Sequence, residues 1–484
     1  MPATKYRIEQ DFIGKKEISA ESLYGIHSVR ARENFPDQNQ FHPEWFMALG
    51  QVKKACYLTA SDFFKRANEK TGIQNIKIKI PSEKLLNALI TAAGEIIQLQ
   101  HFNSFIVPAI SGGAGTSINL NVNEIIANRA IQILGGKPGE YRLADPIEDA
   151  NLFQSTNDVI PSSLKVATIQ LLVSLEESIN DLRIDIEQLE KKHINDLRKG
   201  YTQMQEAVPS SFGRLFSTYS DALSRDWWRI SKCFERIKII NLGGSAIGSG
   251  ITVPRFFIME VSRTLQQITQ LPITRGENLY DATNNLDSLV EVHGILKAHA
   301  VNLEKMVNDI RLLSSDIANK ELLIPRKQLG SSIMPGKVNP VIPEFVISAA
   351  HKIYANDSLI ASLCAQGCLE LNAYLPTIGH ALLESLKLLI SCNKTLKENL
   401  FAGLEINTKS SLEALFNSAS ITTALVPYIG YNLSSKLAAH MIQNKQSIFE
   451  ANSDLQVISE EKLQRILKPG SLLKEGFTLN DLLD

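Results

Sequence analysis

Cysteine is scarce in this 484-residue chain, which contains five. They are scattered along the chain, at Cys56, Cys233, Cys364, Cys368 and Cys392. A small secreted domain that depends on disulfides needs a much denser set of cysteines. Cys364 and Cys368 have the spacing of one helix face, but no nearby cysteine or histidine completes a zinc site. We therefore interpret these two as buried thiols of a packed helix.

Neither sign of charge prevails, because 50 basic side chains face 51 acidic ones. Nucleic-acid binders usually show a basic surplus or stripe, so no nucleic-acid partner is expected. No apolar run reaches the ~18 residues of a membrane-spanning helix. The first residues, MPATKYRIEQDFIGKKE, lack the apolar core of a secretory signal. These absences predict a cytoplasmic globular protein with no membrane partner.

Long helical patterns fill the middle of the chain. Residues 162–199 contain no glycine or proline, and their apolar residues recur mostly at spacings of three or four. Similar stretches follow Pro209, occupy about 284–315, and follow Pro343 and Pro376. Periodic segments longer than about 25 residues favour a helical bundle. We predict a mainly α protein with an N-terminal domain at 1–154, a central long-helix domain at 155–400 and a small helical C-terminal domain at 401–484.

The length of these helices bears on assembly. A helix of about 32 residues is ~48 Å long, more than a small domain is wide. One chain's own loops do not readily cover several such helices, so we expect the bundle to bury apolar surface against other copies in a homo-oligomer. A monomer with polar faces turned outward is the alternative. In the N-terminal domain we expect short helices mixed with glycine-rich loops.

The segment GSSIMPGKVNP, residues 330–340, first suggests a phosphate loop. That loop requires G-x-x-x-x-G-K followed by serine or threonine. Here five residues separate Gly330 from Gly336, and Val338 follows Lys337. The segments GGAGTS (112–117) and GGSAIGSG (243–250) also lack the glycine order of a dinucleotide-binding turn. Nucleotide binding is therefore disfavoured.

Four segments place small hydroxyl residues beside amides or a lysine. Any one of them is more often a helix cap or a turn. Together they offer many hydrogen-bond donors and one fixed positive charge, which suits a small dicarboxylate. The candidate binding residues are Thr116, Ser155, Thr156, Asn157, Thr202, Gln203, Ser331, Ser332, Lys337 and Asn339.

These segments resemble the signature motifs of the aspartase/fumarase superfamily of lyases. The resemblance extends through GGAGTSINLNVNE, QSTND, GYTQMQEAVP, GGSAIGSG and TTALVPYIGY, and so covers nearly the whole chain. It implies a long central helical bundle shared in a homotetramer and flanked by two smaller domains. Each active site would combine segments of three subunits. The resemblance implies no metal and no organic cofactor.

Within the superfamily, YGIHSVRARENF (24–35) resembles the corresponding segment of aspartate ammonia-lyases. The Thr202-Gln203 pair also resembles aspartate ammonia-lyases, because fumarases have Thr-His at these two positions. The implied reaction is the reversible β-elimination of L-aspartate to fumarate and ammonia. A class II fumarate hydratase or another fumarate-releasing lyase is the alternative. A non-catalytic structural relative is the hypothesis from a different class of protein.

The resemblance also implies roles for the candidate residues. Ser331, on a mobile loop, would be the general base that removes the C3 proton and leaves an enediolate. Thr116, Ser155, Thr156 and Ser332 would donate hydrogen bonds to the β-carboxylate. Lys337 and Asn339 would hold the α-carboxylate, and Asn157, Thr202 and Gln203 would surround the amino group. Tyr201 departs from the pattern, since the family usually has arginine there.

Overall fold

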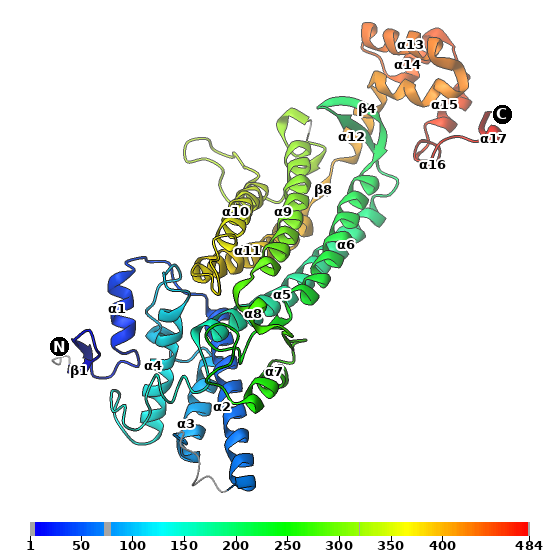
Figure 1. Ribbon diagram of the computed structural model, residues 1–484. Coiled ribbons are helices and arrows are strands. Elements are labelled where there is room, and N and C mark those ends of the chain that lie inside the picture. The colour runs from blue at the N-terminus through cyan, green and yellow to red at the C-terminus, as the bar shows by residue number, and fades with distance from the viewer. Residues whose placement is uncertain (1–4, 72–78, 319, 483–484) are drawn as a thin grey trace. The chain divides into compact units, whose positions relative to one another are not determined.

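The computed structural model describes residues 5–71, 79–318 and 320–482. The described chain is mainly helical (Figure 1). It divides into two compact units, each of which includes part of the bundle helices. Unit 1 comprises Met1–Leu175, Arg229–Lys297 and Lys352–Leu389, and unit 2 comprises Glu176–Trp228, Ala298–His351 and Ile390–Asp484.

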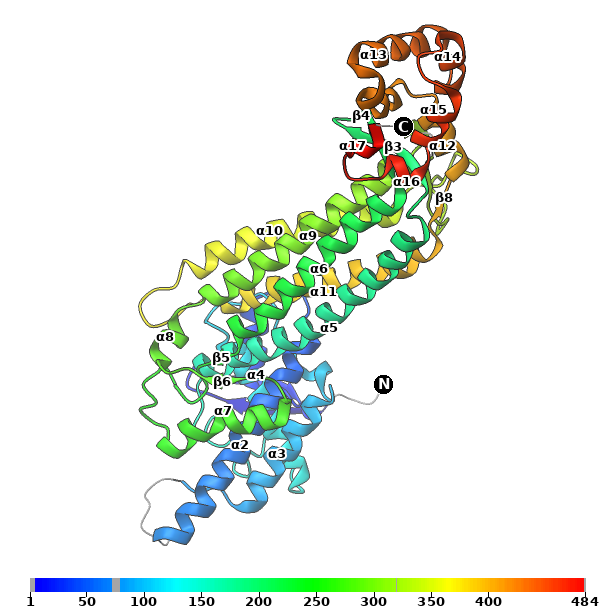
Figure 2. The same cartoon turned by 90° about the vertical axis from the view of Figure 1, so that its right-hand side faces the viewer.

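Five long helices confirm the predicted bundle. They are α5 (Thr156–Lys192), α6 (Phe212–Ile237), α9 (Asp287–Leu313), α10 (Val341–Cys364) and α11 (Leu375–Thr395), and they run alongside one another (Figures 1 and 2). Buried polar side chains link them. In unit 1, His293 of α9 contacts Asp357 of α10 at 3.0 Å and Ser385 of α11 at 2.9 Å. In unit 2, His299 of α9 contacts Asp226 of α6 at 2.9 Å.

The ends of α5 differ from the sequence prediction. The helix begins at Thr156, and Pro161 lies inside its second turn instead of preceding it. It ends at Lys192, although no glycine or proline follows until residue 200. His193 stops it through a local contact of its ring Nδ1 with Asp196 at 2.6 Å. The carbonyl oxygens of His193 and Asp196 then accept hydrogen bonds from the start of α6.

Unit 1 surrounds the first part of α5 with shorter elements. An antiparallel hairpin pairs β1 (Tyr6–Gln10) with β2 (Lys15–Ser19), and β5 (Ile239–Ile240) lies parallel to β6 (Thr274–Arg275). The helices are α1 (Ile26–Asn34), α2 (Pro43–Thr71), α3 (Glu83–Ile97), α4 (Thr116–Ile133), α7 (Arg255–Thr269) and α8 (Leu279–Asn284). The expectation of only short helices before residue 155 is wrong, because α2 has 29 residues. Its fully buried Trp45 donates a hydrogen bond to Ser163 of α5 at 2.9 Å.

Unit 2 carries a second hairpin, in which β3 (Leu197–Thr202) pairs with β4 (Gln205–Ser211). Two short strands, β7 (Leu322–Leu323) and β8 (Glu405–Ile406), pair nearby in an antiparallel arrangement. The remaining helices are α12 (Thr408–Phe416), α13 (Val426–Asn444), α14 (Ile448–Leu455), α15 (Glu460–Ile466), α16 (Pro469–Leu472) and α17 (Leu479–Leu482). Leu415, Leu425, Leu437 and Leu463 belong to one buried cluster that holds this helical segment together.

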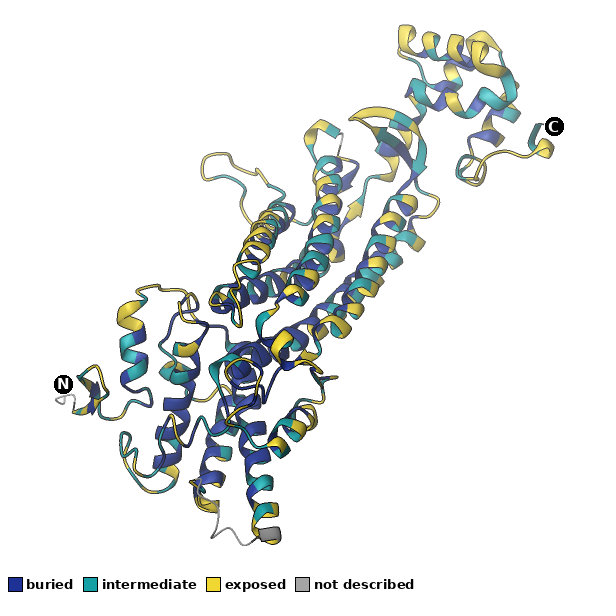
Figure 3. Ribbon diagram, in the orientation of Figure 1, coloured by how far each residue is buried: buried dark blue, intermediate teal, exposed yellow. Residues whose placement is uncertain are grey.

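Burial explains two further features (Figure 3). Helix α5 is long and apolar enough to cross a membrane, but 83% of its apolar window is buried within the structure, as in a core helix. The interpretation of Cys364 and Cys368 as buried thiols of one helix is wrong. Helix α10 ends at Cys364, which is half-buried, and Cys368 lies beyond that end and is exposed.

Candidate functional site

In unit 1, the structure brings two of the predicted segments together at the start of α4 and the start of α5. Thr116 is the first residue of α4, and Thr156 is the first residue of α5. Asn119, one turn into α4, donates a hydrogen bond to the Thr156 hydroxyl at 3.3 Å. The preceding Gly115 has φ 92°, and an added Cβ would lie 2.9 Å from Ile160 of α5. A glycine is therefore needed where the two helices approach each other.

The QSTND segment contacts the glycine-rich segment at 243–250. Asp158 accepts hydrogen bonds from the main-chain N–H groups of Gly243 at 3.1 Å and Ser245 at 3.0 Å. The Asn157 amide donates to the carbonyl of Ala246 at 2.7 Å. Burial raises the pKa of Asp158 to about 6, against the lowering effect of its N–H donors. The GGSAIGSG segment therefore supports the candidate binding residues.

A buried polar group behind Thr156 was not predicted. Lys53 of α2 donates to Gln154 at 2.8 Å and to Asn151 at 3.3 Å, and Asn119 donates to the same Asn151 oxygen at 3.1 Å. Burial lowers the pKa of Lys53 to about 7. Sequence analysis overlooked Lys53, because nothing in the sequence of α2 distinguishes it from the neighbouring Lys54. Because Asn119 also contacts Thr156, this group fixes the position of the predicted binding segment.

In unit 2, the other predicted residues lie on two separate segments. Thr202 and Gln203 occupy the exposed tip of the β3–β4 hairpin. Gln203 and Met204 both have left-handed φ values, 52° and 63°, as a two-residue hairpin turn requires. Residues 330–340 form a loop before α10. Among residues 197–211 and 330–340, no hydrogen bond joins the tip to the loop.

The loop is closed at its base by hydrogen bonds between its own residues, and we call this closure the neck. Gly330 N–H donates to the carbonyl of Lys337 at 2.9 Å, and the Asn339 amide donates to the carbonyl of Gly330 at 2.8 Å. A Cβ at Gly330 would lie 2.7 Å from the Lys337 oxygen, so only glycine fits there. Beyond the neck, the Ser331 hydroxyl accepts hydrogen bonds from the N–H groups of Ile333 at 3.2 Å and Met334 at 3.0 Å.

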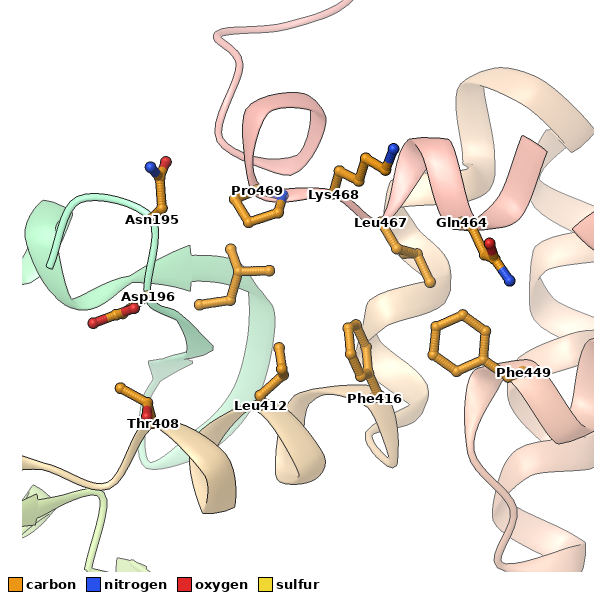
Figure 4. Close-up of a pocket in the computed structure, with 11 residues that line it drawn as sticks. Asn195, Asp196, Thr408, Leu412, Phe416, Phe449, Gln464, Leu467, Lys468 and Pro469 are labelled. Carbon is orange, nitrogen blue, oxygen red and sulfur yellow. The ribbon is translucent and has the colours of Figure 1, made fainter. Parts of the chain in front are cut away.

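Two of the cavities in unit 2 differ in the chemistry of their lining. One, of about 790 Å³, is lined by Lys337 and Asn339 together with the cationic side chains of Arg311 and Arg326. The other, of about 300 Å³, lies among α12, α14 and the segment before α16 (Figure 4). The rings of Phe416 and Phe449 lie 5.1 Å apart at its wall. Its mostly apolar lining includes none of the predicted residues, so of these two cavities the first is the one that suits a carboxylate.

No cluster of three or more metal-ligating His, Cys, Asp or Glu side chains occurs in residues 5–71, 79–318 and 320–482.

Tyr201, which departs from the sequence pattern of the superfamily, has a structural partner. Its hydroxyl donates to the carboxylate of Glu321 at 2.6 Å, and Arg198 donates to the other oxygen of that carboxylate at 3.1 Å. Sequence analysis did not identify Glu321.

Comparison with known proteins agrees with the motifs. The family model described as Lyase matches residues 14–355, and that described as Fumarase C C-terminus matches residues 421–474. The aspartate ammonia-lyase of Bacillus subtilis (strain 168) is 36% identical over 483 residues, which cover 99% of this chain and 98% of the relative. That of Helicobacter pylori (strain ATCC 700392 / 26695) is 37% identical over 472 residues, covering 96% and 98%.

Two solved structures share the fold. A fumarate lyase:delta crystallin from Brucella melitensis bound to cobalt matches with a TM-score of 0.89 and 32% identity, over 97% of this chain and all of the other. A recombinant class II fumarase from Schistosoma mansoni matches with a TM-score of 0.84 and 28% identity, over 96% and 98% of the two chains.

Proposed function

Because the chain belongs to the lyase family of the aspartase/fumarase superfamily, we propose that it catalyses the reversible elimination of ammonia from L-aspartate to give fumarate. The observation that carries the choice of ammonia is Gln203 at the hairpin tip. An ammonium group leaves already protonated, so a neutral amide suffices beside it. Elimination of water benefits more from an acidic group. The two relatives named aspartate ammonia-lyase, which match over nearly the full length of the chain, also support ammonia as the leaving group.

Ser331 is the general base of the proposed reaction. A serine hydroxyl is a weak base unless its anionic form is stabilised. The N–H groups of Ile333 and Met334 already donate to its oxygen. Hydrogen bonds to the charged form of a group favour that form, and the positive charge of Lys337 on the same loop adds to the effect. The loop thus supplies local support for the base.

Removal of the C3 proton places a second negative charge on the β-carboxylate. Thr116, Ser155, Thr156 and Ser332 stabilise this enediolate as donors, and loss of one such donor costs about 3 kcal/mol. Lys337 and Asn339 hold the α-carboxylate, which agrees with their position on one cavity. Thr202, Gln203 and Asn157 surround the amino group. The side-chain N–H of Asn157 donates to the Ala246 carbonyl, which leaves the side-chain oxygen of Asn157 to accept from an ammonium.

The active enzyme is a cytoplasmic homotetramer whose sites combine residues of three subunits. Several bundle helices of unit 2 expose large apolar side chains, including Val301 at 50% and Phe345 at 41%. Burial of such side chains between copies would remove apolar surface from water. The substrates are small molecules, and the loop closes over them. Hydrogen exchange should show stronger protection of residues 330–340 when a dicarboxylate is bound.

One assay separates the candidate reactions. Fumarate absorbs in the ultraviolet through its conjugated double bond, so its release is followed directly with L-aspartate, L-malate and argininosuccinate as substrates. A signal with L-aspartate alone is the expected result. A signal only with L-malate would replace the proposal with fumarate hydration, which the likeness to the Schistosoma mansoni fumarase favours. No signal with any of the three would indicate a non-catalytic relative.

A further inference from the structure

The tip of the β3–β4 hairpin has few attachments of its own. Thr202, Gln203, Met204 and Gln205 are all exposed. The turn also holds two non-glycine residues with left-handed φ values. This conformation is energetically unfavourable for such residues, so it persists only because the flanking strands enforce it. The orientation of Gln203 therefore depends on how the two strands are fixed just below the tip.

Each strand is fixed there by a carboxylate. In the hairpin register, Tyr201 of β3 lies opposite Glu206 of β4, directly below the tip. On the β4 side, Glu206 accepts from Lys199 and from Ser418, each at 2.5 Å. On the β3 side, the Tyr201 hydroxyl donates to Glu321 at 2.6 Å.

Glu321 is the more firmly held of the two carboxylates. It is 2% exposed, and Arg198 donates to its second oxygen at 3.1 Å. The Arg198 guanidinium lies over the rings of Tyr201 and Phe212, with distances of 5.6 and 5.5 Å to the ring centroids. Glu321 also accepts a main-chain hydrogen bond from Asn407 at 3.0 Å. It immediately precedes β7, so it joins the hairpin to the β7–β8 pair.

Resting on the proposed function, we propose that Tyr201 and Glu321 are positioning residues that orient Gln203 toward the amino group of the substrate. They act through the hairpin and do not touch substrate themselves. The Tyr201 hydroxyl remains a proton donor at neutral pH, because burial and the adjacent Glu321 carboxylate raise the pKa of Tyr201 above its ordinary value. Loss of this positioning should weaken the binding of ammonia. It should not affect the binding of fumarate, whose two carboxylates are bound by other segments.

The test uses the amination of fumarate, in which ammonia and fumarate are separate substrates. Tyr201→Phe removes only the hydroxyl. We expect the KM for ammonia to rise about three- to tenfold, while the KM for fumarate stays near the wild-type value. Glu321→Gln, which keeps the shape and removes the charge, should give the same split between the two KM values.

Tyr219→Phe is the matched control. The Tyr219 hydroxyl also donates to a carboxylate of unit 2, Asp309 at 2.9 Å, but it lies between α6 and α9. A purely structural role for Tyr201 would make its variant resemble this control, with both KM values unchanged or both raised alike, and would overturn the inference. A wild-type protein unable to aminate fumarate would instead overturn the proposed function itself.

Discussion

The side-chain amide of Asn241 donates a hydrogen bond of 2.8 Å to the main-chain oxygen of Asn157. That oxygen would normally accept from the residue four positions later in α5, which is Pro161 and has no N–H. Asn241 is 1% exposed and comes from the segment after α6. A side chain distant in sequence thus replaces the missing helical bond, directly beside the candidate binding residues.

Asn241→Ala should therefore lower the free energy of unfolding by about 1–3 kcal/mol, because it removes the donor to the partly buried Asn157 carbonyl together with the contacts of Asn241 with Ser162 and Thr283. Urea unfolding followed by circular dichroism measures the change. In a Pro161→Ala background the helix regains its own N–H, so the same substitution should cost less. An equal cost in both backgrounds would contradict this account of the Asn241 contact.

Ser331→Ala should reduce kcat by about 10²- to 10⁴-fold, the usual contribution of a general base. The thermal midpoint should stay near that of the wild type, because Ser331 lies on a partly exposed loop. Ser348→Ala is the control, since Ser348 is an exposed serine of α10 whose hydroxyl donates only to the Glu344 carbonyl at 2.8 Å. Normal turnover by Ser331→Ala in an intact oligomer would rule out its role as the base.

The contact between His42 and His380 predicts a pH-dependent stability. Their ring nitrogens lie 2.8 Å apart, so one ring donates and the other accepts. Burial, with a smaller effect from His380, lowers the pKa of His42 to about 4. The unfolded chain, with an ordinary histidine pKa, then binds more protons than the folded chain between pH 6.5 and 4. The contribution of neutral His42 to the free energy of unfolding is fully present above about pH 6.5. It is lost as the pH falls through 4, by up to ~3 kcal/mol.

His42→Gln should flatten this loss. We expect the urea midpoint of the wild type to fall more steeply between pH 7 and pH 4.5 than that of the variant, about as the pKa shift dictates. The value at pH 8 serves as the internal reference, because neither ring is protonated in the folded wild type there. Parallel curves for the two proteins would show that His42 does not control the acid limb.

Val301→Glu should weaken the proposed tetramer, because Val301 is 50% exposed on α9, one of the bundle helices. Light scattering after gel filtration should show smaller species for this variant. Ile442→Glu changes an even more exposed residue, at 71%, on α13 outside the bundle, and should leave the assembly intact. Loss of assembly in both variants, or in neither, would count against an interface formed by the bundle.

The bundle was predictable because apolar residues at spacings of three and four define a buried helix face without knowledge of its partners. The ends of α5 were not, because they depend on Asn241 for the start and on the His193–Asp196 contact for the end. The candidate binding segments were found because each is contiguous in sequence. Their supports were missed because they pair distant positions: Tyr201 and Glu321 are 120 residues apart.

The neck of the 330–340 loop sets a length. Its two hydrogen bonds tie Gly330 to Lys337 and to Asn339, so the proposed base on one arm and the proposed carboxylate anchor on the other move as one body. The neck therefore restricts the distance between the proposed base and the proposed carboxylate anchor before substrate binds. A diacid one methylene longer than aspartate would bring the wrong carbon to Ser331. We therefore expect L-glutamate to bind without being converted.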